Sequence, residues 1–316
     1  MTPIDLCGID QACDFLTTIS SERIMTTLSN APQLTSRLVN VGKRKIFVSE
    51  IGTGYPVLML HGGGPGASGL SNYGRNIEAL AQNFRVLIAD MPGYGQSTKG
   101  VDRSDAFGDL ADSMFGLLDA LNIQCAHVIG NSLGGACALR MALDQPMRVS
   151  AMVLMGPGGI GTTRALPTPG LNLLLNYYTG EGASIDKMRT FIREYLVFDG
   201  SQVPESVIQD RFQSSIDPDV VAAPPLRRPN SLPAAIRMDF TRDSRLKRCR
   251  VPTLVLWGYE DRVNRPNGGP TLQKYLLDCD LYMFGKTGHW VQWERAEEFN
   301  AVSTAFLQQR TPALGG

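Results

Sequence analysis

The sequence lacks the features on which several classes of protein depend. Its 30 Lys and Arg side chains balance 30 Asp and Glu side chains, so the 316-residue chain has no formal net charge. Without a basic excess, nothing attracts the chain as a whole to nucleic acid or to an anionic membrane surface, and we expect neither as a partner. No apolar run approaches the roughly 20 residues that span a bilayer. Hydrophobic residues make up 43% of the chain, which is typical of a globular protein.

Paired cysteines are also missing. The chain contains no C-x-x-C pair, and its cysteines are scattered over Cys7, Cys13, Cys125, Cys137, Cys249 and Cys279. This spacing matches no zinc pattern, so we expect no metal site and read the cysteines as free thiols. The first residues include Asp5, Asp10 and Asp14 but no basic segment followed by an apolar one, which argues against a secretory signal. Together these features predict a cytoplasmic protein.

From residue 36 onward, short apolar runs alternate with segments of helical period. The apolar runs are residues 56–60, 85–89, 126–130, 150–155, 253–257 and 281–284. The helical segments are residues 76–82, 105–121, 133–144, 269–278 and 296–309. This alternation predicts an α/β fold with a mostly parallel central sheet that helices cover on both faces. Two further strand-like runs, broken at Gly42, predict an opening hairpin.

The alternation stops between residues 157 and 250, where prolines are frequent and no convincing core strand occurs. About ninety residues of this kind are too many for a loop and predict a helical cap inserted between two strands, with one helix over 185–196. We therefore assign residues 36–156 and 251–316 to the core and 157–250 to the cap. Residues 1–35 form an N-terminal extension with one short helix around 9–17.

The segment Gly130-Asn131-Ser132-Leu133-Gly134 matches the G-x-S-x-G pattern of a nucleophile elbow. It follows an apolar run and precedes a helical segment, which is the context that a sharp strand-to-helix turn requires. Glycines on both sides of the serine remove side chains that would clash inside the turn. We predict Ser132 as the nucleophile.

A serine hydroxyl needs a base, and the chain offers only three histidines. His289 follows the last predicted strand, at the sheet edge where open α/β sheets place their sites. His127 lies inside a predicted strand, where a structural role is the better interpretation. His61 follows the first core strand and is the one serious rival. We predict His289 as the base.

The base needs a carboxylate that fixes its tautomer and stabilises its protonated form. Asp261 and Glu260 both follow the predicted strand 253–257. Asp261 gives the chain order serine, acid, histidine that is typical of α/β-hydrolases, and Glu260 is the runner-up. Adjacent residues project differently, so the sequence alone does not choose between them by geometry.

A glycine run, His61-Gly62-Gly63-Gly64-Pro65-Gly66, follows the first core strand. Glycines let backbone N–H groups approach a substrate oxygen, and we predict an oxyanion hole formed by Gly63 and by Leu133, the residue after the nucleophile. No Gly-Lys-Ser/Thr follows the run, which disfavours phosphate binding.

These motifs resemble those of a known family, the meta-cleavage product hydrolases of bacterial aromatic degradation, which includes members from the biphenyl and steroid pathways. The resemblance covers residues 36 to 307 or so, and its most specific signals are Asn72, Asn131, an arginine in the cap and a His-Trp pair. The segments that carry it are HGGGPGASGLS (61–71), MPGYGQS (91–97), GNSLGG (130–135), MGPGG (155–159) and GHWVQW (288–293).

The resemblance implies an α/β-hydrolase that uses water to cleave the C5–C6 bond of a 2-hydroxy-6-oxo-hexa-2,4-dienoate with an aryl or alkyl group at C6. In such enzymes the dienolate is first converted to its keto form, the serine attacks the C6 ketone, and water then releases the acyl group. No metal or organic cofactor is required, and homo-oligomers are common.

The matching positions also imply the residues that bind the substrate. Arg211 faces the substrate carboxylate, for which a planar guanidinium is suited. Asn72 and Asn131 contact the same polar end, and Trp290 packs beside it. Leu196 and Val263 stand where biphenyl-type members carry Phe near the C6 group.

Two other functions use the same features. A carboxylic-ester or lactone hydrolase would have the same Ser132, Asp261 and His289, because the fold does not fix the substrate. A non-catalytic receptor on this fold would have no need to keep all three. A dehalogenase or epoxide hydrolase would need Asp in place of Ser132.

Overall fold

A computed structural model describes residues 33–312 of the chain. Most of the predicted N-terminal extension, including the helix predicted around 9–17, lies outside the described residues. Within the described part of the chain, no helix is both long and apolar enough to cross a membrane.

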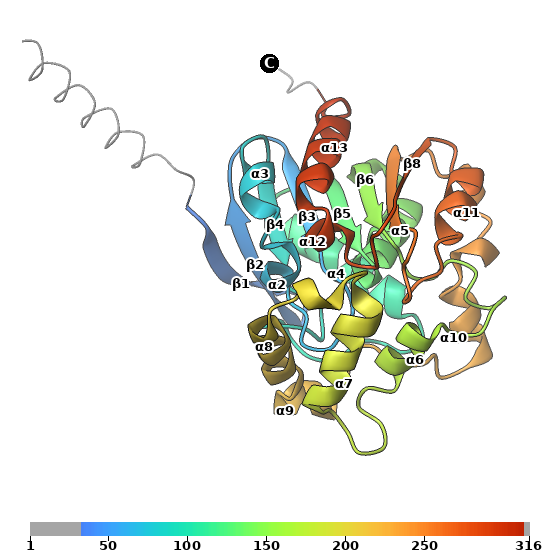
Figure 1. Ribbon diagram of the computed structural model, residues 1–316. Helices are drawn as coiled ribbons and strands as arrows, with labels where there is room; N and C mark the ends of the chain where they lie inside the picture. The colour runs from blue at the N-terminus through green and yellow to red at the C-terminus, as the bar shows by residue number, and fades with distance from the viewer. Residues whose placement is uncertain (1–32, 313–316) are drawn as a thin grey trace, which may run out of the picture. The chain divides into compact units, whose positions relative to one another are not determined.

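The described residues contain one eight-stranded sheet, in the order β1-β2-β4-β3-β5-β6-β7-β8 (Figure 1). Strands β3 to β8 run parallel, whereas β2 is antiparallel to both β1 and β4. Each predicted apolar run is a strand, and the predicted hairpin is β1 with β2. The strands are β1 (Thr35–Val41), β2 (Arg44–Ile51), β3 (Pro56–Leu60), β4 (Arg85–Ala89), β5 (Ala126–Asn131), β6 (Val149–Met155), β7 (Thr253–Gly258) and β8 (Cys279–Phe284).

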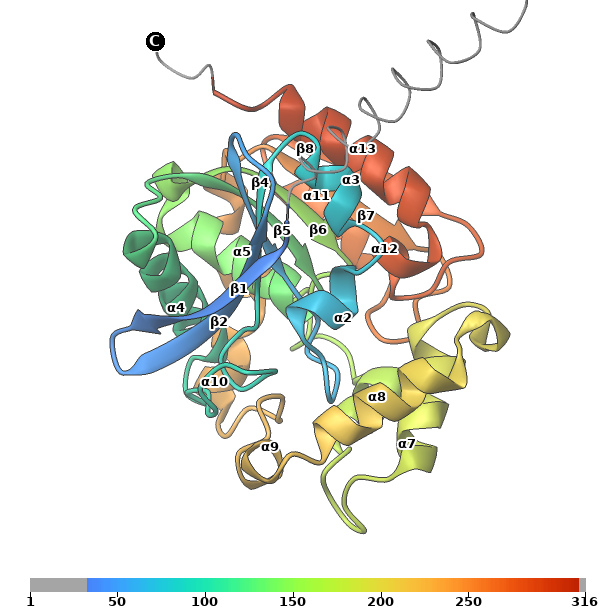
Figure 2. The ribbon, with the colours of Figure 1, turned by 90° about the vertical axis from the view of Figure 1, so that its left-hand side faces the viewer.

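Helices cover both faces of this sheet, because its inner strands are apolar on both sides. In β3, Leu58 and Leu60 pack toward one face while Val57 and Met59 pack toward the other. Figure 2 shows α4 and α5 on one side of the sheet and α3 and α13 on the other. The first layer comprises α4 (Ala106–Ala120), α5 (Leu133–Asp144) and α11 (Gly268–Tyr275), and the second α3 (Ile77–Ala81), α12 (Val291–Glu294) and α13 (Ala296–Gln308). The predicted fold class is confirmed.

Residues 157–250, the predicted cap, form short helical segments beside the carboxyl ends of the strands (Figure 1). The main segments are α6 (Pro169–Leu175), α7 (Ile185–Thr190), a π-helical turn (Phe191–Leu196), α8 (Glu205–Ser215), α9 (Pro218–Ala222) and α10 (Leu232–Arg237). The single helix predicted over 185–196 is thus α7 followed by the π-helical turn. Of these segments, α6, α7, the π-helical turn and α8 share a hydrophobic cluster of their own, which also includes Val263 and Trp290 from the core. The domain boundaries themselves stay a prediction.

The order of strands determines where chemistry can occur. The chain passes from β3 to β4 in one direction across the sheet and from β5 to β6 in the other. The neighbouring strands β3 and β5 therefore flank the switch point where open α/β sheets bind ligands. Leu60, the last residue of β3, is paired with Gly130 near the end of β5. The glycine run after β3 and the serine after β5 therefore begin side by side. The ends of β6, β7 and β8 follow along the same edge.

Two short α-helices of the core were not predicted: α12, which follows His289, and a helix in the loop after β3. α2 (Gly69–Tyr73) has only five residues and begins with a capping box, in which the Ser68 and Ser71 side chains each accept a backbone N–H of the other residue. It is too short to show a helical period in the sequence.

Candidate active site

Ser132 occupies a strained turn between β5 and α5. Its backbone has φ of +52°, a left-handed conformation that is unfavourable for a residue with a side chain. The turn is held by the Ser132 N–H, which donates to Met155 O at 2.8 Å, and by the Gly158 N–H, which donates to Ser132 O at 2.9 Å. A Cβ at Gly134 would lie 2.1 Å from Leu60 O, so the elbow can close only with glycine there.

His289 and Asp261 form a buried pair. The His289 Nδ1 and Asp261 Oδ2 atoms are 2.7 Å apart, and both side chains are almost fully buried. Because a carboxylate oxygen can only accept, Nδ1 carries the proton and Nε2 keeps its lone pair. Nε2 has no hydrogen-bond partner among the described residues. The ring therefore has the tautomer that a general base requires.

Asp261 is held by three further donors. Its Oδ2 also accepts from Trp257 Nε1 at 2.9 Å, and its Oδ1 accepts the N–H groups of Val263 and Asn264, each at 2.8 Å. The neighbouring Glu260 instead accepts the N–H of Thr287 at 3.0 Å. Of the two carboxylates that the sequence left open, the one in contact with His289 is that of Asp261.

The other two histidines are engaged elsewhere. His61 Nε2 accepts the N–H of Met91 at 2.9 Å, which leaves Nδ1 to donate to Gly62 O at 2.8 Å. Burial lowers the pKa of His61, so the ring stays neutral and holds the glycine run. His127 is hydrogen-bonded to Thr311, and burial lowers its pKa to about 4. Neither ring is free to take a proton from Ser132.

The two predicted oxyanion residues are neighbours. A Cβ at Gly63 would lie 2.9 Å from Cδ2 of Leu133. Leu133 is the first residue of α5, where backbone N–H groups have no acceptor within the helix. The Tyr94 hydroxyl donates to Gly63 O at 3.0 Å and so fixes the Gly63 peptide. Sequence reasoning did not single out Tyr94, although it lies in the segment MPGYGQS.

A small cavity of about 20 Å³ brings most of the predicted site together. Its lining includes Gly63, Asn72, Asn131, Ser132, Leu196, Arg211, His289 and Trp290. Val263 does not line it: the side chain is buried in the hydrophobic cluster of the cap segment, while its N–H contacts Asp261. Leu174 and Phe191 line the cavity and were not predicted.

Arg211, from α8, is a buried cation without a carboxylate partner. Only 4% of the residue is exposed, and its Nε donates to Pro65 O at 3.1 Å. Within residues 33–312 its guanidinium forms no ion pair, and it lies 5.9 Å from the centre of the Trp290 ring. Burial lowers the pKa of Arg211 to about 10, so the side chain remains charged at neutral pH. A buried, unpaired positive charge favours an anionic ligand.

The two asparagines are oriented by neighbouring groups. Asn72 Oδ1 accepts from Gln292 Nε2 at 2.8 Å, which leaves the Asn72 amide N–H groups for a ligand. Asn131 Nδ2 donates to Met155 O at 3.3 Å and to His289 O at 3.4 Å, so it also ties the histidine loop to the elbow. Gln292 was not predicted, although it belongs to the segment GHWVQW.

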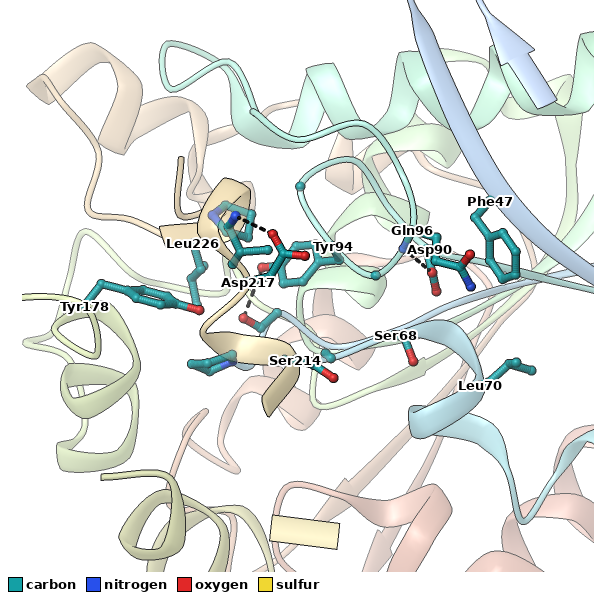
Figure 3. A pocket seen from close by; sticks show the side chains of 18 of the residues that line it. Phe47, Ser68, Leu70, Asp90, Tyr94, Gln96, Tyr178, Ser214, Asp217 and Leu226 are labelled. Atoms are coloured by element: carbon teal, nitrogen blue, oxygen red, sulfur yellow. Dashed lines mark hydrogen bonds between the residues drawn. The ribbon is translucent and has the colours of Figure 1, made fainter. Parts of the chain in front are cut away.

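A larger cavity of about 300 Å³ lies between the core and the cap segment. Figure 3 shows Tyr178, Asp217 and Leu226 of the cap segment on one side and Tyr94, Gln96 and Asp90 of the core on the other. It shares Gly63 and Leu174 with the small cavity, but Ser132 and His289 do not line it. The candidate active site is therefore the small cavity, although the other cavity is larger.

Comparisons with known proteins identify the family of the chain. Residues 55–217 match the family model of the alpha/beta hydrolase fold. The chain is 38% identical to a 2-hydroxy-6-oxo-6-phenylhexa-2,4-dienoate hydrolase of Comamonas testosteroni, over 84% of this chain and 92% of the relative. It is 37% identical to a 2-hydroxy-6-oxononadienedioate/2-hydroxy-6-oxononatrienedioate hydrolase of a Pseudomonas species, over 83% of this chain and 91% of the relative. Among solved structures, a meta-cleavage product hydrolase of Pseudomonas fluorescens is similar with a TM-score of 0.76 and 29% identity, covering 87% of this chain and 98% of that one.

Proposed function

The chain belongs to the meta-cleavage product hydrolases, carbon–carbon bond hydrolases of the α/β-hydrolase fold, and on this basis we propose that it cleaves the C5–C6 bond of a 2-hydroxy-6-oxo-hexa-2,4-dienoate. The observation that carries the proposal is Arg211, a buried cation without an ion-pair partner in the described chain, in the same cavity as Ser132 and His289. The substrate carboxylate supplies the missing anion. A plain ester substrate has no such group.

The side chains around the cavity support a chemical route. After conversion of the dienolate to its keto form, His289 Nε2 accepts the Ser132 proton as Oγ attacks the C6 carbonyl. The N–H groups of Gly63 and Leu133 stabilise the oxyanion, and Asp261 stabilises the protonated imidazole. The C5–C6 bond then breaks, its electron pair passes to the dienoate fragment, and C5 takes the proton that His289 received from Ser132, which returns His289 to its neutral form. Water, activated by His289, releases the second product as a carboxylic acid.

The remaining residues divide between the two ends of the substrate. Arg211, Asn72, Asn131 and Trp290 bind the dienoate end, whereas Leu196 contacts the group at C6. Val263 lies outside the cavity wall, so we propose that it acts on the C6 group only through its neighbours.

A spectrophotometric assay tests the proposal. The wild-type protein should bleach a yellow dienoate that carries phenyl or methyl at C6, and Ser132→Ala should abolish multiple turnover. If the wild type leaves the dienoate unchanged but rapidly hydrolyses p-nitrophenyl esters, the protein is an esterase and the proposal is wrong. If Ser132→Ala bleaches as fast as the wild type, the route through Ser132 is wrong.

We further propose that the enzyme works in the cytoplasm as a homo-oligomer, without nucleic acid, metal or organic cofactor. The cysteines of the described chain, Cys125, Cys137, Cys249 and Cys279, are free thiols, which supports a reducing compartment. The oligomer rests on the family resemblance alone. Light scattering after size exclusion measures it, and a mass equal to one chain would contradict it.

A further inference from the structure

A partly buried carboxylate that the route above does not use lies next to the histidine loop. Glu294 is the last residue of α12. Its Oε1 accepts the N–H of Gly288 at 2.9 Å, and its Oε2 accepts the N–H of Phe198 at 2.7 Å. Gly288 immediately precedes His289, and Phe198 belongs to the cap segment. One carboxylate thus joins the loop that carries the base to the cap.

The same two segments also meet directly, backbone against backbone. Leu196 O accepts the N–H groups of both His289, at 2.8 Å, and Trp290, at 3.2 Å. A Cβ at Gly288 would lie 2.7 Å from the carbonyl carbon of Val197 and 2.9 Å from Leu196 O. Glycine at this position allows the two backbones to approach closely. The Glu294 carboxylate then bridges the histidine loop and the cap segment.

The surroundings of Glu294 disfavour its charged form. Burial raises its pKa to about 7, the N–H groups of Phe198 and Gly288 act in the opposite direction, and the negative charge of Asp261 raises it further. Among the described residues it forms no ion pair with Lys or Arg. A neutral amide or an apolar side chain would be easier to bury here, so a fold requirement alone does not explain the carboxylate.

We propose that Glu294 is a positioning residue that aligns His289 with Ser132 by joining the histidine loop to the cap segment. The proposal rests on the proposed function, because it takes His289 as the base. Two acceptor oxygens are needed for two N–H groups, and only a carboxylate supplies both from one side chain of this length. The alignment of the base therefore depends on the position of the cap segment at Phe198. Placement of the substrate, which Arg211 and the asparagines provide, does not depend on Glu294.

Glu294→Gln is the discriminating variant, because it keeps the shape but turns one acceptor into an N–H₂ group that faces a donor. In the dienoate assay we expect kcat to fall about tenfold or more while KM stays within about twofold, since base alignment is lost and binding is kept. Glu297→Gln, on the exposed side of the neighbouring helix, is the matched control and should behave as the wild type. Glu294→Asp, whose carboxylate is withdrawn by one methylene, should also lose kcat, and it provides the test if Glu294→Gln does not fold.

A second readout follows the base without the dienoate. Diisopropyl fluorophosphate reacts when Ser132 Oγ bonds to phosphorus and fluoride leaves, a step that requires His289 to take the serine proton. Its rate of inactivation should fall in parallel with kcat in Glu294→Gln and stay unchanged in Glu297→Gln. Unchanged kcat and inactivation rates, or a loss confined to KM, would overturn the role of Glu294. If the wild type is inactivated but does not cleave the dienoate, the proposed function fails, and the inactivation rates alone decide the role of Glu294.

Discussion

Two buried charged side chains near the candidate site differ in how fully the protein satisfies them. Asp261 accepts four hydrogen bonds, so its charge is matched within the described structure. Arg211 makes one hydrogen bond to a backbone carbonyl and has no ion-pair partner in residues 33–312. A buried charge is stable only when it is paired or hydrogen-bonded. The contrast indicates that Asp261 orients His289, whereas Arg211 binds an anionic ligand.

Removal of the Arg211 charge should therefore reduce activity on the dienoate much more than activity on a neutral ester. For Arg211→Gln we expect a loss in kcat/KM of ~30-fold, which corresponds to about 2 kcal/mol for a charge-assisted hydrogen bond. Hydrolysis of p-nitrophenyl acetate should change little. Steady-state kinetics on both substrates measure the difference.

Arg227→Gln, at an exposed position of the cap segment, removes the same charge away from the cavity and should leave both activities unchanged. Equal losses on the dienoate and the ester in Arg211→Gln would contradict carboxylate recognition. They would point instead to a general disturbance of the site.

The Gln292 amide should act through Asn72 alone. Gln292→Leu removes the donor that holds Asn72 Oδ1, and we expect KM for the dienoate to rise roughly fivefold, about 1 kcal/mol for one hydrogen bond. A double-mutant cycle with Asn72→Ala checks the pathway: in the Asn72→Ala background, Gln292→Leu should have almost no further effect. Additive losses would show that Gln292 acts by another route.

At the scale of elements, the strand-to-helix elbow tolerates no side chain at one of its glycines. Gly134→Ala would place Cβ 2.1 Å from Leu60 O, in backbone that cannot move without shifting β3. We expect the free energy of unfolding to fall by about 3 kcal/mol, the upper range for overpacking. Gly285→Ala is the control, because no atom lies within 4 Å of its added Cβ. Denaturant unfolding of both variants would contradict the argument if their midpoints were equal.

The contact between α12 and the cap segment should make stability depend on pH in a defined direction. Burial, and to a smaller extent the charge of Asp261, raises the pKa of Glu294 from 4.5 to about 7 in the folded chain. Between these values the folded state keeps a proton that the unfolded state loses. The contribution of Glu294 is therefore stabilising below pH 4.5 and is lost as pH rises to about 7.

This linkage predicts a difference between variants. From pH 5 to pH 7.5, the melting temperature of the wild type should decrease relative to that of Glu294→Gln, which has no group to titrate at this position. Parallel thermal unfolding curves across the range measure it. A wild-type melting temperature that rises relative to the variant would mean that the pKa of Glu294 is lowered by the fold.

For the molecule as a whole, the sequence predicted most of what is encoded locally. The inner strands are buried on both faces and have continuous apolar sequences, so each was predicted to within one or two residues. The elbow and the glycine run are local motifs, and with only three histidines the choice of His289 was narrow.

The features that were missed depend on contacts between distant segments. Gln292 and Asn72 are hydrogen-bonded although they are 220 residues apart in the sequence, and Glu294 and Phe198 are 96 residues apart. No local sequence pattern predicts either pair. Val263 was expected at the C6 group, yet burial with the cap cluster places its side chain outside the small cavity. The choice between Asp261 and Glu260 also needed the path of the loop after β7.

The space between the core and the cap segment should influence which substrates are accepted. Leu174, in α6, lines both the small cavity and the larger one, so Leu174→Ala removes part of the wall between them. We expect the ratio of kcat/KM for the 6-phenyl dienoate to that for the 6-methyl dienoate to rise severalfold, because a larger group gains room. The free energy of unfolding should fall by about 3 kcal/mol as a buried leucine is truncated. Leu173→Ala, a partly buried neighbour that lines neither cavity, is the control. An unchanged ratio in Leu174→Ala would mean that the larger cavity has no influence on the group at C6.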